Sequence, residues 1–178
     1  MIYELNSDYF VRGLVESDVE GAYPRWFQDQ EICKYSSNGK FPKTLEYFRR
    51  YVSESNCEDR IVWAICHRTE GHIGNLTLQN IANVNRNAEF AIMIGNKSHW
   101  GRGVALLAGR ALLRHGFFKL NLERVYCGTA VTNTGMCQLA ERLGMTREGQ
   151  RRKALFLDGS WSDVIEFGIL REEFRERV

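Results

Sequence analysis

Polar and apolar residues alternate along several short stretches of the chain. The stretches "YFVRGLV" (residues 9–15), "RIVWAIC" (60–66) and "GHIGNLTLQNI" (71–81) are rich in β-branched and aromatic residues, which is typical of strands. The second and third are separated only by "HRTEG", a glycine-ended connection of hairpin length. We therefore expect these two strands to pair antiparallel.

A further strand is predicted over residues 87–95, "NAEFAIMIG". Successive side chains of a strand point to opposite faces of a sheet. The alternation therefore places Glu89, Ala91 and Met93 on one face, and Phe90, Ile92 and Ile94 on the other.

Other segments have the spacing of helices. Ser17 is followed three positions later by Glu20, a capping-box pattern that predicts a helix over about residues 18–30. In residues 43–55, apolar side chains recur at helical intervals, at Leu45, Phe48, Tyr51 and Val52. A second helix is expected there.

The second half of the chain predicts a helix ending near Leu120, a strand over residues 124–131, and a short helix over residues 133–144 that Gly144 closes. Two final strands should flank the Asp158-Gly159 turn. Helices cross between some of the strands, so some pairs must be parallel. The fold class expected is a mixed α/β sandwich.

Length and composition favour a single domain that spans residues 1–178. The chain is 44% hydrophobic and 12% aromatic, contains only two prolines, and has no repeat or linker-like stretch. Its 24 basic and 22 acidic side chains are spread along the whole length, which gives no indication of a nucleic-acid partner.

The five cysteines include no C-x-x-C pair, which argues against a disulfide framework or a paired zinc site and suits a reducing compartment. The first ten residues lack a basic-then-apolar signal pattern. No apolar run approaches the ~20 residues needed to cross a bilayer. We expect a cytoplasmic protein with no membrane partner.

The stretch "HWGRGVALLAG", residues 99–109, places two glycines before a helix. It contains no G-x-x-x-x-G-K-[ST] string, so it is not a P-loop. A dinucleotide fingerprint starting at Gly101 would have Leu106 in place of its third glycine. Two interpretations remain: a short turn whose amides, from Gly101 to Ala105, face an anion at a helix N-terminus, or simply a flexible helix start.

Motifs elsewhere in the chain separate these two interpretations. The sequence resembles the GNAT superfamily of acyl-CoA-dependent N-acetyltransferases, whose phosphate loop reads [QR]-x-x-G-x-[GA]. The segment Trp100-Gly101-Arg102-Gly103-Val104-Ala105 matches it except at the first position. With tryptophan at that position, the loop resembles that of the branch that acetylates the N-termini of ribosomal proteins.

The same branch has further motifs that this chain carries in order. They are Ala88-Glu89-Phe90, Arg124, an N-x-x-S-x-x-[LV]-x-E-[KR]-x-G-[FM] pattern over residues 133–145 with Met136 in place of the serine, Glu148-Gly149, and residues 158–163. The resemblance covers roughly residues 8–173.

The resemblance implies the GNAT fold: a twisted, mostly antiparallel sheet flanked by helices, with a splayed parallel pair, residues 87–95 and 124–131, as the walls of the acyl-CoA cleft. It implies acetyl-CoA as cosubstrate. The implied contacts with this carrier are Met93, Ile94, Trp100, Gly101, Arg102, Gly103, Val104, Ala105 and Asn133. Asparagine is also a preferred helix N-cap, and Asn133 can serve in both roles.

Amine acetylation also needs a base, because an amine with a pKa near ~10.4 arrives protonated at neutral pH. Glu89 on the cleft wall is the leading candidate, acting through a water. The alternative is that Glu89 pairs with Arg86 and orders the strand. Many family members supply the general acid from a tyrosine where this chain has Ala140. Either another hydroxyl serves here, Tyr126 or Ser98, with no spacing argument to choose between them, or local dipoles stabilise the thiolate and it takes its proton from water.

Other noticeable residues have simpler interpretations. His67 and His72 lie across the expected hairpin beside Cys66, but without H-E-x-x-H or C-x-x-C patterns we predict no metal. His99 is expected to pack in its loop, and Cys137 to be an ordinary core residue.

The acceptor pocket is expected within residues 26–51, by resemblance. This segment is polar and aromatic without a strong acidic cluster, which disfavours a polyamine. The expected acceptor is a primary amine of a peptide N-terminus or of a nucleotide-linked amino sugar, and the protein is expected to be a monomer or homodimer. A catalytically silent acyl-CoA-binding module or sensor is the alternative, suggested by Ala140 and Met136.

Overall fold

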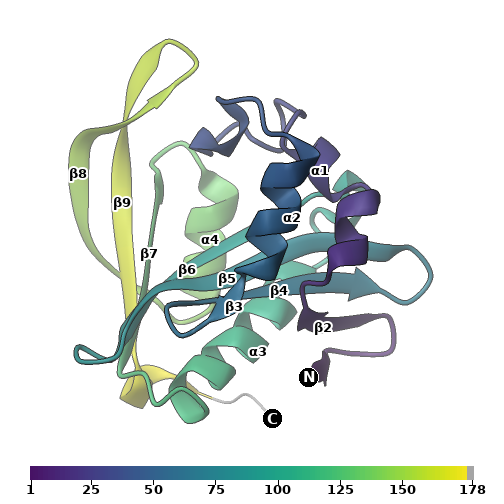
Figure 1. Ribbon diagram of the computed structural model, residues 1–178. Coiled ribbons are helices and arrows are strands. Elements are labelled where there is room, and N and C mark those ends of the chain that lie inside the picture. The colour runs from purple at the N-terminus through teal and green to yellow at the C-terminus, as the bar shows by residue number, and fades with distance from the viewer. Residues whose placement is uncertain (176–178) are drawn as a thin grey trace.

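A single twisted sheet of nine strands organises the molecule in the computed structural model, which describes residues 1–175 (Figure 1). The strand order is β1-β2-β4-β5-β6-β7-β9-β8, and β3 pairs with β4. The strands are β1 (Ile2–Glu4), β2 (Tyr9–Gly13), β3 (Asn56–Cys57), β4 (Arg60–His67), β5 (Gly71–Ala82), β6 (Asn87–Ile94), β7 (Arg124–Ala130), β8 (Thr146–Leu157) and β9 (Ser160–Leu170).

Short and long helices connect these strands. The α-helices are α1 (Tyr23–Trp26), α2 (Leu45–Ser53), α3 (Val104–Phe118) and α4 (Thr134–Arg142). Four 3-10 turns join them: η1 (Glu16–Glu20), η2 (Ser37–Gly39), η3 (Lys97–His99) and η4 (Arg171–Glu173). The two hydrophobic clusters lie on opposite faces of the sheet: one includes the buried side of α3, the other that of α2.

The predicted mixed α/β class is confirmed. All strand pairs of the described chain are antiparallel except β6 with β7, because α3 crosses between those two strands. The antiparallel pairing of β4 with β5 is also confirmed. The alternation along β6 is as expected: Phe90 is buried in the α3-side cluster, whereas Met93 packs against the α2-side cluster.

The hairpin of β8 and β9 extends beyond the other strands, at the left of Figure 1. Its turn is the predicted Asp158-Gly159 pair, and both residues have positive φ, 46° and 81°. Those angles match a type I′ turn, for which this dipeptide is suited. Two short strands, β1 and β3, were not expected from the sequence.

The single helix predicted over residues 18–30 is wrong. The segment forms η1 and then the four-residue α1, with Pro24 at the start of α1. A proline is tolerated only in the first turn of a helix, so a new helix begins there. The Ser17–Glu20 capping box does not form either: the Asp18 carboxylate accepts from the backbone amide of Val15 at 2.9 Å.

Candidate active site

A cleft opens where β6 and β7 part. The parallel pairing runs from Asn87 opposite Arg124 to Glu89 opposite Tyr126 and stops there. Beyond this point β6 continues to pair with β5 as far as Ile94, and β7 pairs with β9. The space between the diverging strands is part of a cleft of about 1140 Å³.

The glycine-rich turn lies at one end of this cleft. Gly101 and Gly103 both have positive φ, 73° and 79°, and both line the cleft with Val104 and Ala105. Gly103 is the N-cap of α3, and no side chain caps that N-terminus. The first-turn amides have no intrahelical acceptor and carry the positive end of the helix dipole, so the turn can bind an anion.

Trp100 joins this turn to the end of β6. Its indole Nε1 donates to the carbonyl of Ile94 at 2.9 Å, and the ring is 41% exposed. Met93 and Ile94 line the cleft, as the resemblance implies. Arg102 is exposed at the surface of the turn and is not among the residues that line the cleft.

Asn133 is the N-cap of α4. Its Oδ1 accepts from the amide of Met136 at 3.2 Å, and its Nδ2 donates to the Thr129 hydroxyl at 3.0 Å. The capping interpretation is therefore confirmed. Asn133 also lines the cleft, which leaves its second role as a prediction.

Glu89 lies on the wall of the cleft, held by two side-chain amides. Its Oε2 accepts from Gln79 Nε2 at 3.0 Å and from Asn80 Nδ2 at 2.9 Å. Within residues 1–175, Oε1 has no hydrogen-bond donor. The alternative of a Glu89–Arg86 pair is wrong, because Arg86 binds Glu123 and Asn121 instead.

Of the two hydroxyls considered from the sequence, only Tyr126 lines the cleft. Burial, together with the nearby charge of Glu89, raises the pKa of its phenol, which therefore stays protonated at neutral pH. Ser98 lies in η3 and donates to Asn96 Oδ1 at 2.8 Å. Ala140, at the position where many relatives have tyrosine, is fully buried in the core.

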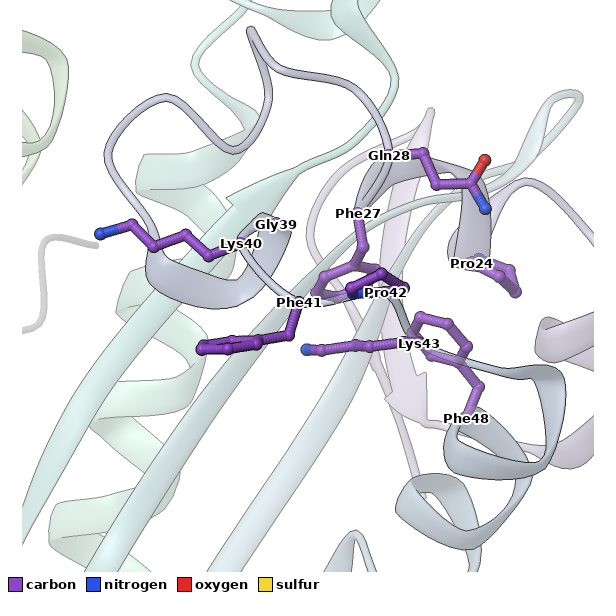
Figure 2. A pocket seen from close by; sticks show the side chains of 9 residues that line it. All are labelled: Pro24, Phe27, Gln28, Gly39, Lys40, Phe41, Pro42, Lys43 and Phe48. Atoms are coloured by element: carbon purple, nitrogen blue, oxygen red, sulfur yellow. The ribbon is translucent and has the colours of Figure 1, made fainter. Parts of the chain in front are cut away.

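The opposite end of the cleft is built from α1, η2 and α2. As expected, residues of the 26–51 segment line it, chiefly aromatic ones: Phe27, Tyr35, Tyr47, Phe48 and Tyr51. A smaller hollow of about 320 Å³ adjoins it, and Phe27, Phe41, Pro42 and Lys43 are among the residues that line it (Figure 2). The Lys43 ammonium lies 4.7 Å from the Phe27 ring centre and 4.8 Å from that of Tyr47.

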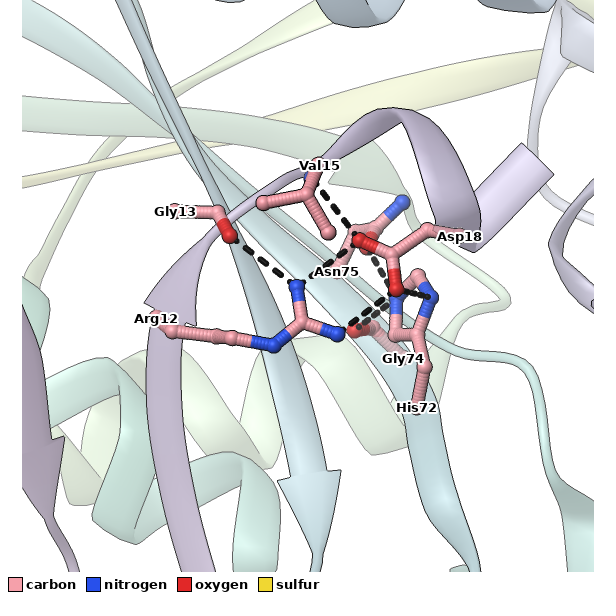
Figure 3. A network of polar contacts seen from close by, with 7 residues as sticks. All are labelled: Arg12, Gly13, Val15, Asp18, His72, Gly74 and Asn75. Atoms are coloured by element: carbon pink, nitrogen blue, oxygen red, sulfur yellow. Dashed lines mark hydrogen bonds and ion pairs between the residues drawn. The ribbon is translucent and has the colours of Figure 1, made fainter.

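A buried polar network supports this end (Figure 3). Arg12 donates two hydrogen bonds to Asp18, at 2.6 and 2.8 Å, and His72 Nδ1 lies 3.4 Å from the same carboxylate. Burial opposes ionisation of Asp18, but the hydrogen bonds from Arg12 and the nearby His72 ring outweigh it and hold the pKa of Asp18 well below its usual range. The His72 ring packs against Trp26, with ring centres 4.9 Å apart.

Trp26 in turn fixes the end of β6. A Cβ atom added at Gly95 would lie 1.9 Å from the indole of Trp26, so glycine is required for this approach. Sequence reasoning placed Trp26 in the acceptor segment but missed this contact, and it also missed the Glu89 partners on β5. Neither contact has a local sequence signal, because each joins residues on different elements.

The parallel strands β6 and β7 separate beside an uncapped helix N-terminus, and a carboxylate lies on the wall of the cleft. These features define an α/β protein with a cleft that suits an anionic carrier. Comparison with known sequences agrees: residues 9–146 match the acetyltransferase (GNAT) domain, and the chain belongs to this family. It is an acetyl-CoA-dependent N-acetyltransferase.

One relative is the "Putative ribosomal N-acetyltransferase YdaF" of Bacillus subtilis (strain 168), 34% identical over 101 residues. That match spans 57% of this chain and only 55% of the relative. Among solved structures, the ribosomal L7/L12 α-N-protein acetyltransferase RimL bound to coenzyme A superposes with a TM-score of 0.86 at 19% identity, over 96% of this chain and 98% of that one.

The spermidine N-acetyltransferase of Vibrio cholerae, in complex with CoA and spermine, superposes with a TM-score of 0.85 at 24% identity. The match covers 94% of this chain and 98% of that chain. Both structural likenesses establish the fold. Among residues 1–175, no helix is both long enough and apolar enough to cross a bilayer.

Proposed function

We propose that the protein moves an acetyl group from acetyl-CoA directly to a primary amine of a small molecule, such as a nucleotide-linked amino sugar, or of a protein N-terminus. One observation carries this proposal: a continuous cleft joins the uncapped N-terminus of α3 to an aromatic pocket, with Glu89 and Tyr126 between them. An acyl carrier entering from one end and an amine from the other meet at these two side chains.

The carrier is held mainly by backbone groups. The amides from Gly101 to Ala105 bind its diphosphate, with Arg102 as an additional positive charge. Main-chain groups at Met93 and Ile94, on the edge of β6 that β7 leaves unpaired, bind the pantetheine arm or the thioester oxygen. Trp100 and Asn133 complete the carrier contacts.

The reaction removes two protons from the ammonium nitrogen, one before the attack and one as the tetrahedral intermediate collapses; the thiolate takes up one proton, and the other is released to water. Glu89 accepts the proton of the ammonium through a water, and the free amine attacks the thioester carbonyl. The C–N bond forms, the C–S bond breaks, and backbone amides of β6 stabilise the oxyanion in between. Tyr126 then protonates the leaving thiolate, a step for which a phenol kept neutral at working pH is suited.

The charges at the acceptor end support an acidic acceptor over a polyamine. The Glu31 carboxylate pairs with Lys97 at 2.6 Å, and that of Glu166 pairs with Arg151 at 2.5 Å. Lys43, by contrast, lies over aromatic rings, and it donates a hydrogen bond to the neutral amide of Asn38, at 3.2 Å. The pocket therefore offers a positive charge without a matching carboxylate.

The experiment measures thiol release from acetyl-CoA in the presence of four amine classes: acidic peptides with a free N-terminus, nucleotide-linked amino sugars, aminoglycosides and polyamines. We expect acceptor-dependent release with one of the first two classes. Turnover confined to polyamines would contradict the acceptor assignment. Tight CoA binding without acceptor-dependent release across the whole panel would instead support a silent binding module.

A further inference from the structure

Three side chains with metal-binding atoms meet beside the cleft, at a junction of two distant segments, and of the three His99 also lines the cleft. His67 is the last residue of β4, Glu70 lies in the connection of β4 to β5, and His99 ends η3. Glu70 Oε1 lies 3.2 Å from His99 Nε2 and 3.7 Å from His67 Nδ1, and all three ligand atoms lie within 4.8 Å of one another. The cluster brings His67 and His99 together. Their spacing in the sequence does not predict this contact.

The His99 ring is held with one nitrogen satisfied and the other not. The residue is 1% exposed, and its Nδ1 shares a hydrogen bond of 2.8 Å with the Tyr9 hydroxyl. Its Nε2 faces Glu70 at ion-pair distance but has no partner in hydrogen-bond geometry. A buried polar nitrogen is ordinarily hydrogen-bonded, so an atom in this position is left available to a cation in the cluster.

The separations suit a small tetrahedral cation. Zinc binds histidine nitrogen and carboxylate oxygen at about 2.0–2.2 Å, which puts neighbouring ligand atoms of a tetrahedron about 3.4 Å apart. The two Glu70 contacts, 3.2 and 3.7 Å, bracket this value, and all three ligand atoms lie within 4.8 Å of one another. Two histidines and one carboxylate, with a fourth position open to water, form a donor set that zinc accepts.

Outer partners already orient the ligands. Tyr9 fixes the His99 ring through Nδ1, and Asn96 Nδ2 donates to Glu70 Oε2 at 3.0 Å, which directs Oε1 toward the histidines. Such outer contacts are typical of metal-bound histidine and carboxylate groups. His67 Nδ1 accepts a hydrogen bond from the Glu70 backbone amide at 3.4 Å and lies 3.1 Å from the Thr69 hydroxyl, so both groups have to move away for that nitrogen to bind a cation.

We propose that His67, Glu70 and His99 form a site for Zn²⁺ or a similar divalent transition metal. This replaces the expectation of no metal that the sequence motifs gave. The site lies directly before Trp100 and the phosphate turn, and the bound cation ties the β4–β5 connection to that segment. Its role is therefore structural support of the carrier-binding end of the cleft, with no part in the acetyl transfer itself.

The test uses chelator-treated full-length protein carrying Cys57→Ser, because Cys57 is the exposed thiol among the cysteines and could bind zinc by itself. Zn²⁺ is titrated by calorimetry, Co²⁺ by visible absorption, and the Tm is measured with and without Zn²⁺. We expect one equivalent of each metal, absorption without thiolate charge-transfer bands, and a higher Tm with Zn²⁺.

His67→Gln and Glu70→Gln should each weaken Zn²⁺ binding at least tenfold and remove the Tm shift, whereas Glu4→Gln, a change to an exposed carboxylate on β1, should leave both unchanged. Both test positions are partly exposed, and a Tm without metal close to that of the parent shows that the variants fold. Absence of saturable binding, or binding that the two variants retain, would overturn the proposal. In that case the pair of His99 and Glu70 is an ion pair only.

Discussion

Glu89 and Tyr126 stand opposite each other at the last paired position before β6 and β7 separate. The register places a carboxylate and a phenol at the mouth of the gap, on strands that run in the same direction. Each then has a distinct expected role, because the carboxylate accepts hydrogen bonds from two amides while the phenol remains protonated.

Glu89→Gln should lower kcat by about 10²–10⁴-fold, the range for loss of a general base, with little change in CoA affinity. Steady-state rates and calorimetry with CoA check the two parts separately. Glu20→Gln, at an exposed carboxylate of η1 outside the cleft, is the matched control. If Glu89→Gln turns over at the parental rate, Glu89 is not the base, and the carrier assignment is unaffected.

Tyr126→Phe should lower kcat by about 10²-fold or more and leave KM for acetyl-CoA unchanged. Because the pKa of Tyr126 is raised, the parent enzyme should lose no activity through this group until the pH passes the ordinary tyrosine value of about 10. Rates measured from pH 6 to 10 check this. An alkaline decline below pH 9 that disappears in the variant would contradict it.

Gly103→Ala should raise KM for acetyl-CoA about tenfold, because a non-glycine residue at positive φ costs roughly 1–2 kcal/mol and the turn relaxes away from its anion-binding shape. Gly159→Ala is the control, since that glycine also has positive φ and open space around it but lies at a hairpin tip. The two variants should lose similar stability, and only the first should lose carrier affinity. Equal KM values would remove the turn from the binding site.

Lys43→Gln should raise KM for an acidic acceptor several-fold, by loss of one partly exposed charge contact, and should not impair any turnover of spermidine. The control is Lys119→Gln, at an exposed lysine that follows α3 and is not among the residues that line the cleft. Acceptor KM values at low and high salt provide the measurement. An unchanged KM for every acidic acceptor would show that Lys43 does not contact the substrate.

Asp18→Asn should destabilise the fold by about 3–5 kcal/mol at pH 7, because it breaks a buried ion pair and leaves Arg12 without its carboxylate. The folded-state pKa of Asp18 is depressed, so its contribution is complete above the unfolded value of about 3.9 and declines as the pH falls toward the folded value. Urea unfolding of parent and variant at pH 7 and pH 3.5 should therefore show a smaller difference at the lower pH. A constant difference would mean that packing, not charge, explains the loss.

Local patterns predicted much of this molecule. The alternation along residues 87–95 gave the correct faces of β6, and the positive-φ residues at 103 and 159 stand where turn chemistry requires glycine. Pro24 indicates a break in the helix predicted over residues 18–30, because it stands at the start of α1. The capping-box pattern obscured this indication. These features depend on neighbours within a few residues, which a sequence displays directly.

Contacts between distant elements were not predictable in the same way. The amides that hold Glu89 come from the adjacent strand, and the cluster of His67, Glu70 and His99 forms only when η3 folds against the β4–β5 connection. No residue spacing encodes such a meeting. The contacts to coenzyme A and the catalytic roles of Glu89 and Tyr126 stay predictions until the experiments above are made.

The Trp26–Gly95 contact also constrains how this enzyme can diverge. One indole touches the backbone that ends the carrier-side strand and anchors the helix that begins the acceptor pocket. A mutation that reshapes α1 for a new amine should therefore also displace the end of β6. New acceptor preferences should arise more readily through η2, because α2 packs in the same hydrophobic cluster as Trp26.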